Sequence, residues 1–212
     1  MGKSKNISLA GVRRLPKYHR YLGELINNDV ARISSVELGK QIGFTSSQIR
    51  QDLCCFGEFG QQGYGYNVSD LFNQINYILG LSKEYKVVIL GAGNIGQAVA
   101  NYHGFNKLGY SIAALFDKNP KITGIKINDI EVRDIDTLDE YLINNEVHIG
   151  VICVPSNNAQ DVCNLLVKND IRAIWNFAPI DLSAPADTTV ENVHLADSLF
   201  TLTYLFNAKL IV

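Results

Sequence analysis

Val87-Val-Ile-Leu-Gly-Ala-Gly-Asn-Ile-Gly96 is the stretch from which the fold of this chain is inferred. Val87–Leu90 is an apolar run of strand length, and a helix predicted over Asn94–His103 begins inside a Gly-x-Gly-x-x-Gly pattern. In a strand–turn–helix unit of this kind, the first glycine allows a tight turn and the second lets the backbone approach a pyrophosphate. The third permits close packing of helix on strand, and the helix start binds phosphate. The residues predicted to hold a dinucleotide are therefore Gly91, Ala92, Gly93, Asn94, Ile95 and Gly96.

The next predicted strand indicates which dinucleotide is bound. Ser111–Phe116 is followed directly by Asp117. A carboxylate at this place accepts hydrogen bonds from the adenosine ribose and repels a 2′-phosphate, so NAD(H) is favoured over NADP(H). The positive charge of Lys118 weakens that repulsion, and we include both residues in the predicted site.

Strands and helices alternate from Lys86 onward. This alternation predicts a parallel sheet with right-handed crossovers, and with the glycine pattern it predicts an α/β, Rossmann-type domain. The chain then ends on a helix with a broad apolar stripe. The further elements that we predict are a helix from Thr137, capped by the Thr137–Glu140 pair, to Asn145, a strand over His148–Val154, a helix over Asn157–Asn169, a strand over Ala173–Phe177 and the C-terminal helix Ala196–Ala208.

The N-terminal part of the chain has a different, helical pattern. Pro16 is a favourable first helical residue, and apolar residues follow it at helical spacing up to Asn27–Asn28. Ser34 with Glu37 forms a capping box for a short helix that ends at Gly43. The Thr45–Gln48 pair repeats this signature and opens a helix from Ser46 to about Cys54. Two capped helices joined by a tight turn predict a helix-turn-helix.

A segment rich in glycine and aromatic residues, Phe56–Val68, follows the second of these helices. It predicts a β-hairpin, and a hairpin after a recognition helix is the wing of a winged-helix domain. Ser69-Asp70 is predicted to cap a further helix. The predicted domains are a winged-helix DNA-binding domain over 1–81, a Rossmann domain over 86–193 and a dimerisation helix over 194–212.

Charge is distributed unevenly along the chain. Residues 1–53 carry nine Lys and Arg against four acidic residues, a net +5, whereas residues 81–212 carry ten against fifteen, a net −5. A basic N-terminal segment followed by an acidic C-terminal segment is expected when only the N-terminal segment binds a polyanion such as DNA. The four cysteines and four histidines lack the spacing of a metal site. No apolar run approaches the ~20 residues of a membrane span, so we expect a cytoplasmic protein that binds neither metal nor membrane.

Binding of the dinucleotide without turnover is the favoured interpretation. A nicotinamide dehydrogenase needs an acid or base beside the transferred hydride. No Tyr here has a Lys four residues later, and no His stands at an obvious strand end. An oxidoreductase whose N-terminal domain only mediates assembly stays an alternative. A second alternative is a transcription factor that answers to another nucleotide or senses redox state through Cys54–Cys55.

The chain resembles the Rex family of bacterial redox-sensing transcriptional repressors. The segments that carry the resemblance lie between about Leu15 and Phe206, and the most specific of them runs from Gln48 to Val68. They are Ser46-Ser-Gln-Ile-Arg-Gln-Asp-Leu53, Phe56-Gly-Glu-Phe-Gly60, Gly63-x-Gly-Tyr-Asn-Val68, Gly91–Gly96, Asn101-Tyr-His-Gly-Phe105, Asn176-Phe-Ala-Pro179 and the C-terminal helix.

This resemblance implies a homodimeric repressor that binds palindromic operator DNA when NADH is scarce and releases it when NADH accumulates. The ligand is then NADH or NAD⁺, bound and not turned over. Short or forked polar side chains of the recognition helix suit base edges, and basic side chains before it suit phosphates. The predicted DNA contacts are Arg13, Arg14, Lys17, Arg20, Ser46, Ser47, Gln48, Arg50, Gln51 and Tyr64.

NAD⁺ and NADH differ in the charge of the nicotinamide ring, so only the pocket around that ring can distinguish them. An apolar wall disfavours the cation, because burying an unpaired charge is costly. Val154-Pro155 and Phe177, at the ends of two predicted strands, are the candidates for that wall. The resemblance also implies that the C-terminal helix is exchanged between subunits, in a domain-swapped dimer that transmits the signal.

The chain departs from the family pattern at two places. His194 stands where the family has an Asp that is thought to pair with a basic residue or a Tyr, and Ser198 replaces an acid four residues later. This change is expected to weaken the coupling of ligand to DNA or make it dependent on pH. Gln61-Gln62 stands at the wing tip in place of basic residues, so fewer phosphate contacts are expected there.

Overall fold

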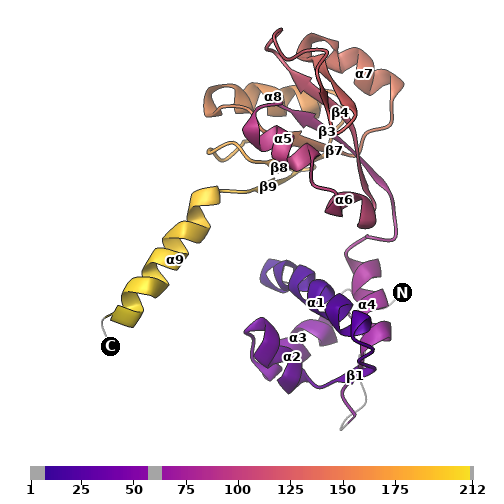
Figure 1. The fold of residues 1–212 in the computed structure, drawn as a ribbon, viewed down its shortest axis with the longest axis vertical. Coiled ribbons are helices and arrows are strands. Elements are labelled where there is room, and N and C mark those ends of the chain that lie inside the picture. The colour runs from indigo at the N-terminus through magenta and orange to yellow at the C-terminus, as the bar shows by residue number, and fades with distance from the viewer. Residues whose placement is uncertain (1–7, 57–63, 211–212) are drawn as a thin grey trace. The chain divides into compact units, whose positions relative to one another are not determined.

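The computed structural model describes residues 8–56 and 64–210. The chain divides into two compact units, Met1–Lys83 and Glu84–Val212, and each is described here by itself (Figure 1). None of the described helices is long and apolar enough to cross a membrane.

In its described residues, the N-terminal unit has four helices around one core, with a two-stranded ribbon. Tyr18, Leu22, Ile49 and Leu71 are among its fully buried side chains. In the ribbon, Arg32 pairs with Asn67 and Ile33 with Tyr66, in antiparallel orientation. The elements are α1 (Leu9–Asn27), β1 (Arg32–Ile33), α2 (Ser35–Ile42), α3 (Ser46–Phe56), β2 (Tyr66–Asn67) and α4 (Val68–Ile78).

The start of α1 differs from the prediction. The helix begins at Leu9, seven residues before Pro16, and Pro16 lies inside it. Ser8 is the N-cap, and its hydroxyl accepts a hydrogen bond from the Gly11 N–H at 3.1 Å. Proline is disfavoured inside a helix because it has no N–H to donate. Here the cap at Ser8 and the burial of one helix face outweigh that loss.

The predicted helix-turn-helix is confirmed, with both of its capping pairs. The Ser34 hydroxyl accepts from the Glu37 N–H at 3.1 Å, and the Glu37 carboxylate accepts from the Ser34 N–H at 3.0 Å. Gly43 ends α2 in the left-handed region, at φ 77°. The Thr45–Gln48 pair makes the same reciprocal bonds at 3.0 and 3.2 Å. These local bonds define the turn that presents α3.

The predicted wing is described only in part, because residues 57–63 lie outside the described residues. In the described part, Tyr66–Asn67 pairs with β1, which was not predicted as a strand. The helix that follows is capped two residues earlier than the predicted Ser69. Asn67 is the N-cap of α4, and its side-chain oxygen accepts from the Asp70 N–H at 3.0 Å.

The C-terminal unit is built on a seven-stranded sheet of order β5-β6-β4-β3-β7-β8-β9. All neighbours in it are parallel except β5 and β6, so the predicted Rossmann-type sheet is confirmed. Residues of α5 and α6 pack with Val87 and Ile89 of β3, whereas residues of α7 and α8 pack with Val88 and Leu90. The strands are β3 (Tyr85–Leu90), β4 (Tyr110–Asp117), β5 (Lys126–Ile127), β6 (Ile130–Asp134), β7 (Ile149–Ile152), β8 (Ala173–Asn176) and β9 (Thr189–Asn192); the helices are α5 (Asn94–Ala100), α6 (Gly104–Lys107), α7 (Leu138–Asn144), α8 (Ser156–Lys168) and α9 (Leu195–Leu210).

Two predictions in this unit were wrong in detail, and three strands were missed. The helix predicted over Asn94–His103 ends at Ala100, and α6 follows as a separate short helix. Thr137 does not cap α7 through its side chain, because its hydroxyl donates to the Asp134 carbonyl at 2.7 Å, within a 3₁₀ turn. Strands β5, β6 and β9 were not predicted. β5 and β9 lie at the two edges of the sheet, where the burial that marks a strand in sequence is weak.

Candidate functional site

The turn between β3 and α5 requires glycine at two positions. Gly91 has φ 100°, a conformation that L side chains rarely adopt, and a Cβ there would lie 2.6 Å from the Cys153 carbonyl oxygen. A Cβ on Gly96 would overlap the Gly91 carbonyl oxygen. The first and third glycines thus have the structural roles that were predicted for them. Gly93 differs, because a Cβ there would meet open space.

Gly93 leaves the start of α5 accessible. It is the N-cap residue, it is exposed, and it has no side chain with which to cap the helix. Asn94 and Ile95 form the first helical turn, whose N–H groups have no acceptor within the helix. Ala92 is fully buried beneath the turn. This arrangement suits the approach of a phosphate to the backbone.

Asp117 joins the end of β4 to the glycine turn. Its Oδ2 accepts from the Ala92 N–H at 2.7 Å, and its Oδ1 accepts from the Asn119 N–H at 2.8 Å. Each carboxylate oxygen can accept a further hydrogen bond, because it has a second lone pair. The side chain therefore positions the turn and can still receive hydroxyl donors from a ligand.

A cavity of about 240 Å³ opens beside this turn. It brings together six of the predicted ligand residues: Gly91, Gly93, Asp117, Lys118, Val154 and Pro155. Residues from α8 and the turn before α7 complete the lining, and sequence reasoning missed them because their helix face was not known. These additional lining residues include Ile135, Asn158, Asp161 and Val162.

Phe177 is not among the residues that line this cavity. It lies just beyond the end of β8, and its ring is 4.6 Å from that of Trp175. Val154 and Pro155 instead share the cavity with Asp117. The three residues predicted to form one apolar wall therefore do not line one cavity together.

The thiols of this unit are held in the neutral form. Cys153 lines the cavity, and burial raises the pKa of its thiol to about 12. Burial also raises the pKa of Cys163. A neutral thiol is a poor nucleophile and reacts slowly with oxidants. Cys54, on α3, is exposed. Among the described residues, no cluster of His, Cys, Asp or Glu side chains could hold a metal ion.

The second candidate site is the exposed face of α3. Ser47, Gln48, Arg50 and Gln51 are exposed, and Ser46 is half-buried. The Gln48 side-chain oxygen already accepts a hydrogen bond from the Thr45 N–H in the cap described above, so the oxygen is used within the domain. Arg50 donates to the Ser35 hydroxyl at 3.1 Å, a bond that holds its guanidinium beside the start of α2.

Arg14, one of the predicted DNA contacts, forms an ion pair within the domain. Its Nε and Nη2 donate to the two carboxylate oxygens of Asp52, both at 2.6 Å, and the Tyr18 hydroxyl donates to Asp52 at 2.7 Å. Asp52 is only 6% exposed. The guanidinium of Arg14 therefore links α1 to α3 within the domain, and 22% of its side chain is exposed.

The pKa values of Arg14, Tyr18 and Asp52 are all shifted from their ordinary values, and the shifts keep the ion pair between Arg14 and Asp52 charged. Burial alone would raise the pKa of Asp52, but the hydrogen bonds from Arg14 and Tyr18 and the charge of Arg14 bring it below the ordinary value. The hydrogen bond to Asp52 raises the pKa of Arg14. Burial, and then the bond to Asp52, raise the pKa of Tyr18. The pair is therefore ionised at neutral pH.

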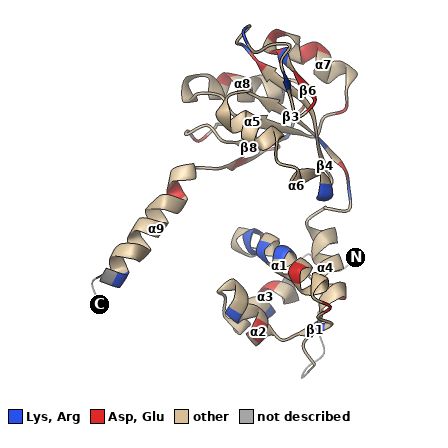
Figure 2. Ribbon diagram, in the orientation of Figure 1, with Lys and Arg blue, Asp and Glu red and all other residues tan. Residues whose placement is uncertain are grey.

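Other basic side chains do face solvent on this unit. Arg13, Lys17 and Arg20 are exposed on α1, where Figure 2 shows a series of basic positions. Tyr64 is 69% exposed, and the guanidinium of Arg32 lies 5.9 Å from its ring and donates to its carbonyl at 3.3 Å. Arg32 was not among the predicted contacts, because nothing local in sequence places it beside Tyr64.

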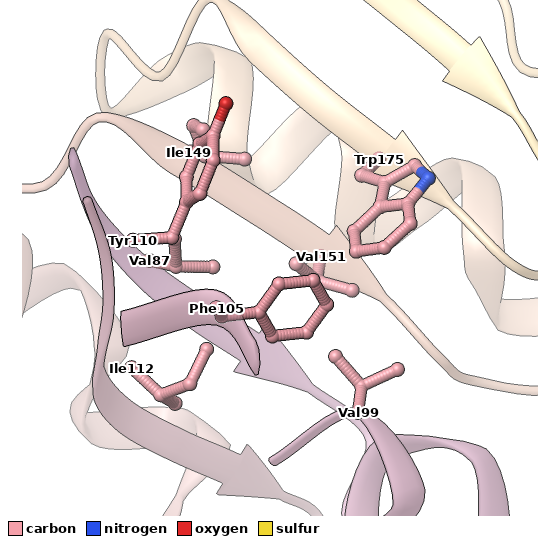
Figure 3. Close-up of a pocket in the computed structure, with 8 residues that line it drawn as sticks. All are labelled: Val87, Val99, Phe105, Tyr110, Ile112, Ile149, Val151 and Trp175. Carbon is pink, nitrogen blue, oxygen red and sulfur yellow. The ribbon is translucent and has the colours of Figure 1, made fainter. Parts of the chain in front are cut away.

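An apolar cavity of about 300 Å³ lies on the α5–α6 side of the sheet (Figure 3). Phe105 of α6 and Val99 of α5 stand over residues of the central strands, and the Trp175 ring lies 5.9 Å from that of Phe105. The lining residues are Val87, Val99, Phe105, Tyr110, Ile112, Ile149, Val151 and Trp175. None of them carries a charge, so this cavity suits an apolar side chain and not a nucleotide.

Comparisons with known proteins give one family model for each of the two parts of the chain. Residues 6–54 match the family model "Putative DNA-binding protein N-terminus", and residues 82–180 match "CoA binding domain". A curated relative named "Redox-sensing transcriptional repressor Rex", from Clostridium botulinum (strain Hall / ATCC 3502 / NCTC 13319 / Type A), is 67% identical over 98% of this chain and 99% of its own length. A relative of the same name from Clostridium kluyveri is 65% identical over the same shares.

Solved structures give the same result. "Crystal structure of RSP, a Rex-family repressor" is 52% identical with a TM-score of 0.91, over 98% of this chain and 97% of that one. RSP "in complex with beta-NADH" is 51% identical over the same shares, and RSP "in complex with beta-NAD+ and operator DNA" is 54% identical over 98% and 95%. Both also have a TM-score of 0.91.

A helix-turn-helix unit joined to a Rossmann-type unit, with a cavity beside its glycine turn, is the arrangement of a transcription regulator that carries its own sensor domain. The chain belongs to the Rex family of redox-sensing transcriptional repressors. It is a regulator and not an enzyme, as the sequence analysis favoured.

Proposed function

We propose that this protein represses transcription by binding palindromic operator DNA and leaves it when NADH binds. The observation that carries the proposal is the cavity beside the glycine turn, with Asp117 on its wall. RSP structures of the same fold are described with NADH, and with NAD⁺ and operator DNA. NADH or NAD⁺ is then a ligand that is bound and not turned over.

The cavity suits the adenosine end of the dinucleotide. In this proposal, Asp117 accepts from the ribose hydroxyls while Ile135, Val154 and Val162 contact the base. Val154 and Pro155 therefore belong to the adenosine end, and Phe177 alone of the predicted apolar wall remains a candidate for the nicotinamide end. The pyrophosphate lies at the start of α5, against Gly93, Asn94 and Ile95.

The charges of the cavity favour an adenosine without a further phosphate. Asp117 and Asp161 contribute two carboxylates to the lining, against the single ammonium of Lys118. NADP(H) carries a 2′-phosphate and coenzyme A a 3′-phosphate on the ribose, and either group would meet this excess of negative charge. We therefore propose NAD(H) as the ligand, although the matching family model is described by coenzyme A.

The deciding experiment measures DNA release by each cofactor. A palindromic duplex selected by the protein from a random-sequence library is labelled, and its fluorescence anisotropy is followed at fixed salt. We expect NADH to release the duplex at concentrations well below those of NAD⁺. To change the protein from mostly bound to mostly free, NADH must bind the released state more tightly than the DNA-bound state by roughly 5 kcal/mol. Equal release by both would overturn the sensor role. Release that requires oxidation of the protein would point to its thiols instead.

The proposed DNA interface is the exposed face of α3 with basic residues around it. It comprises Arg50 and its helical neighbours, three basic residues of α1 and the Tyr64–Arg32 pair of the wing. Arg32 replaces Arg14 in this assignment. The proposed contacts are Arg13, Lys17, Arg20, Arg32, Ser46, Ser47, Gln48, Arg50, Gln51 and Tyr64.

Arg50→Ala is expected to weaken operator binding about 10- to 100-fold, because a forked side chain that reads a base edge contributes about 1–3 kcal/mol. Lys40→Ala is the matched control, since Lys40 is an exposed basic residue in the last turn of α2 that we do not place on DNA. Anisotropy at one salt concentration measures both. An equal loss in the two variants would contradict a specific role for Arg50.

We also propose that the protein is a homodimer whose C-terminal helices are exchanged. Every described side chain of α9 is exposed within the chain, including Leu199 at 61%, Leu202 at 62% and Phe206 at 61%. A helix with such an apolar face requires a partner surface. The partner that we propose is a second copy of the chain, whose apolar cavity around Phe105 and Trp175 can receive side chains of α9.

A charge on the apolar face of α9 tests the dimer. Leu202→Asp with Phe206→Asp is expected to convert the protein to a monomer, because two carboxylates buried in the interface would each lose several kcal/mol of solvation. Thr201→Asp is the control, since the helical period places it about 100° around the helix from Leu202 and about 140° from Phe206. Light scattering after size-exclusion chromatography gives the mass. A dimer that withstands the double substitution would exclude α9 from the interface.

The proposed roles divide the chain into a DNA-binding part over 1–81, a sensor over 86–193 and a dimerisation helix over 194–212. A repressor of this kind acts where the operator and the NAD(H) pool are both accessible. We therefore place the protein in the cytoplasm.

A further inference from the structure

Asn176, the last residue of β8, is a buried polar side chain with a complete set of partners. It is 0% exposed. Its Nδ2 donates to the Ile180 carbonyl and the Asn192 side-chain oxygen, each at 2.8 Å, and lies 3.3 Å from the Ala178 carbonyl. Its Oδ1 accepts from the Ala178 N–H at 2.9 Å. Only an amide offers a donor and an acceptor in this arrangement, so the residue fixes the loop after β8.

The same side chain connects that loop to β9. Asn192 is the last residue of β9, and beyond its bond with Asn176 its own Nδ2 donates to Asp181 at 3.1 Å. The Val193 N–H also donates to the Asn176 carbonyl at 2.8 Å. Residues 177–181 and the end of β9 are therefore held together by side chains as well as by the sheet.

The connection continues to the start of α9. His194 Nε2 lies 3.2 Å from the Asp181 carboxylate, and α9 begins at the next residue, Leu195. The side chain of Asp181 is 84% exposed. Exposed pairs of this kind are weak. The hydrogen bonds of the buried Asn176 are therefore the stable part of this series of contacts. The exposed contact of His194 with Asp181, beside α9, is its weak part.

We infer that Asn176 is a positioning residue that couples the dinucleotide site to the C-terminal helix. The inference rests on the proposed function, which places Phe177, the neighbour of Asn176, at the nicotinamide end of the ligand. A ligand that shifts Phe177 displaces a loop that Asn176 and Asn192 tie to β9. The start of α9 then moves with that loop, and α9 is the element proposed to join the subunits.

The test uses amide hydrogen exchange of the full-length protein with and without NADH. Asn192→Ala removes the side-chain link between the loop and β9 while leaving the bonds of Asn176 to the loop in place. In the wild type, NADH is expected to change the exchange of residues 189–197. In Asn192→Ala that change is lost, while the Kd for NADH stays within about threefold of the wild-type value.

Operator release gives a second readout of the same coupling. Coupling between two sites is typically 5- to 150-fold, and we expect it to fall about tenfold in Asn192→Ala. Asn169→Ala is the control, because it removes an amide bonded to Asp139 and Leu165 on the far side of the domain. Asn176→Asp replaces the donor Nδ2 of the buried amide with a carboxylate oxygen, which can only accept. This variant is also expected to lose coupling. If this variant does not fold, Asn192→Ala decides alone.

The outcomes separate this inference from the proposed function. Failure of NADH to bind the wild type overturns both. Binding of NADH without any change of exchange at residues 189–197 overturns only the coupling role. An NADH-induced change that persists in Asn192→Ala, equal to that in wild type and Asn169→Ala, also overturns it.

Discussion

Gly96→Ala is expected to lower the free energy of unfolding of the Glu84–Val212 unit by about 3 kcal/mol, the upper range for forcing extra atoms into a packed site. The new Cβ would overlap the Gly91 carbonyl oxygen, which is backbone and cannot rotate away. The turn and the start of α5 must separate to accommodate it. NADH affinity is expected to fall about 100-fold, because the backbone N–H groups that would meet the pyrophosphate are displaced.

Gly93→Ala is the matched control in the same turn. A Cβ at Gly93 meets no atom within 4 Å, so the free energy of unfolding should change by less than about 0.5 kcal/mol. The methyl group would nevertheless stand at the helix start and hinder the phosphate. Urea unfolding and NADH fluorescence titration measure the two quantities for each variant. Equal stability of the two variants would show that the close contact of Gly96 is not a packing constraint.

Local signals predicted the parts of the fold that local bonds determine. The two capping pairs before α2 and α3 and the glycine turn after β3 each lie within a few residues of sequence, and the structure has all three. A pattern over such a short span needs no knowledge of the rest of the chain. The parallel orientation of the predicted strands followed from the alternation of strands and helices along the chain.

The parts that sequence could not predict depend on distant residues. The partner of Arg14 is 38 positions away, so a basic residue at the start of the chain was assigned to DNA when its charge is used inside the domain. Asn158 and Asp161 line the cavity beside the glycine turn only because α8 directs that face toward it. The edge strand β9 has no strong apolar alternation, and its pairing with β8 is what defines it.

Asp52→Ala is the second large effect, and it concerns the N-terminal unit. The substitution is expected to lower the free energy of unfolding of that unit by about 3 kcal/mol, the low end for breaking a buried ion pair. It leaves the Arg14 guanidinium without its carboxylate and the Tyr18 hydroxyl without its acceptor. Arg14→Ala should lower stability by a similar amount. The double variant should lower it by less than the sum, because both substitutions remove one shared interaction.

DNA binding distinguishes this structural role of Arg14 from a phosphate contact. Arg20→Ala is expected to reduce the salt dependence of operator binding by about one unit of slope, because one phosphate contact is lost. Arg14→Ala should leave that slope unchanged while lowering the fraction of folded protein. A reduced slope in Arg14→Ala, measured at temperatures where the variant is fully folded, would return Arg14 to the DNA interface.

Acid gives an independent test of the same pair, because its sign follows from the pKa of Asp52. That pKa lies below the ordinary value of 3.8 in the folded protein, so the carboxylate contributes stability that is complete above about pH 4. As the pH falls through the folded pKa, the group becomes protonated and the contribution disappears. Wild type should therefore lose its stability advantage over Asp52→Asn below pH 4, as measured by urea unfolding from pH 7 to pH 2.5. A constant advantage over that range would mean that Asp52 stabilises α3 through its shape and hydrogen bonds, and not through its charge.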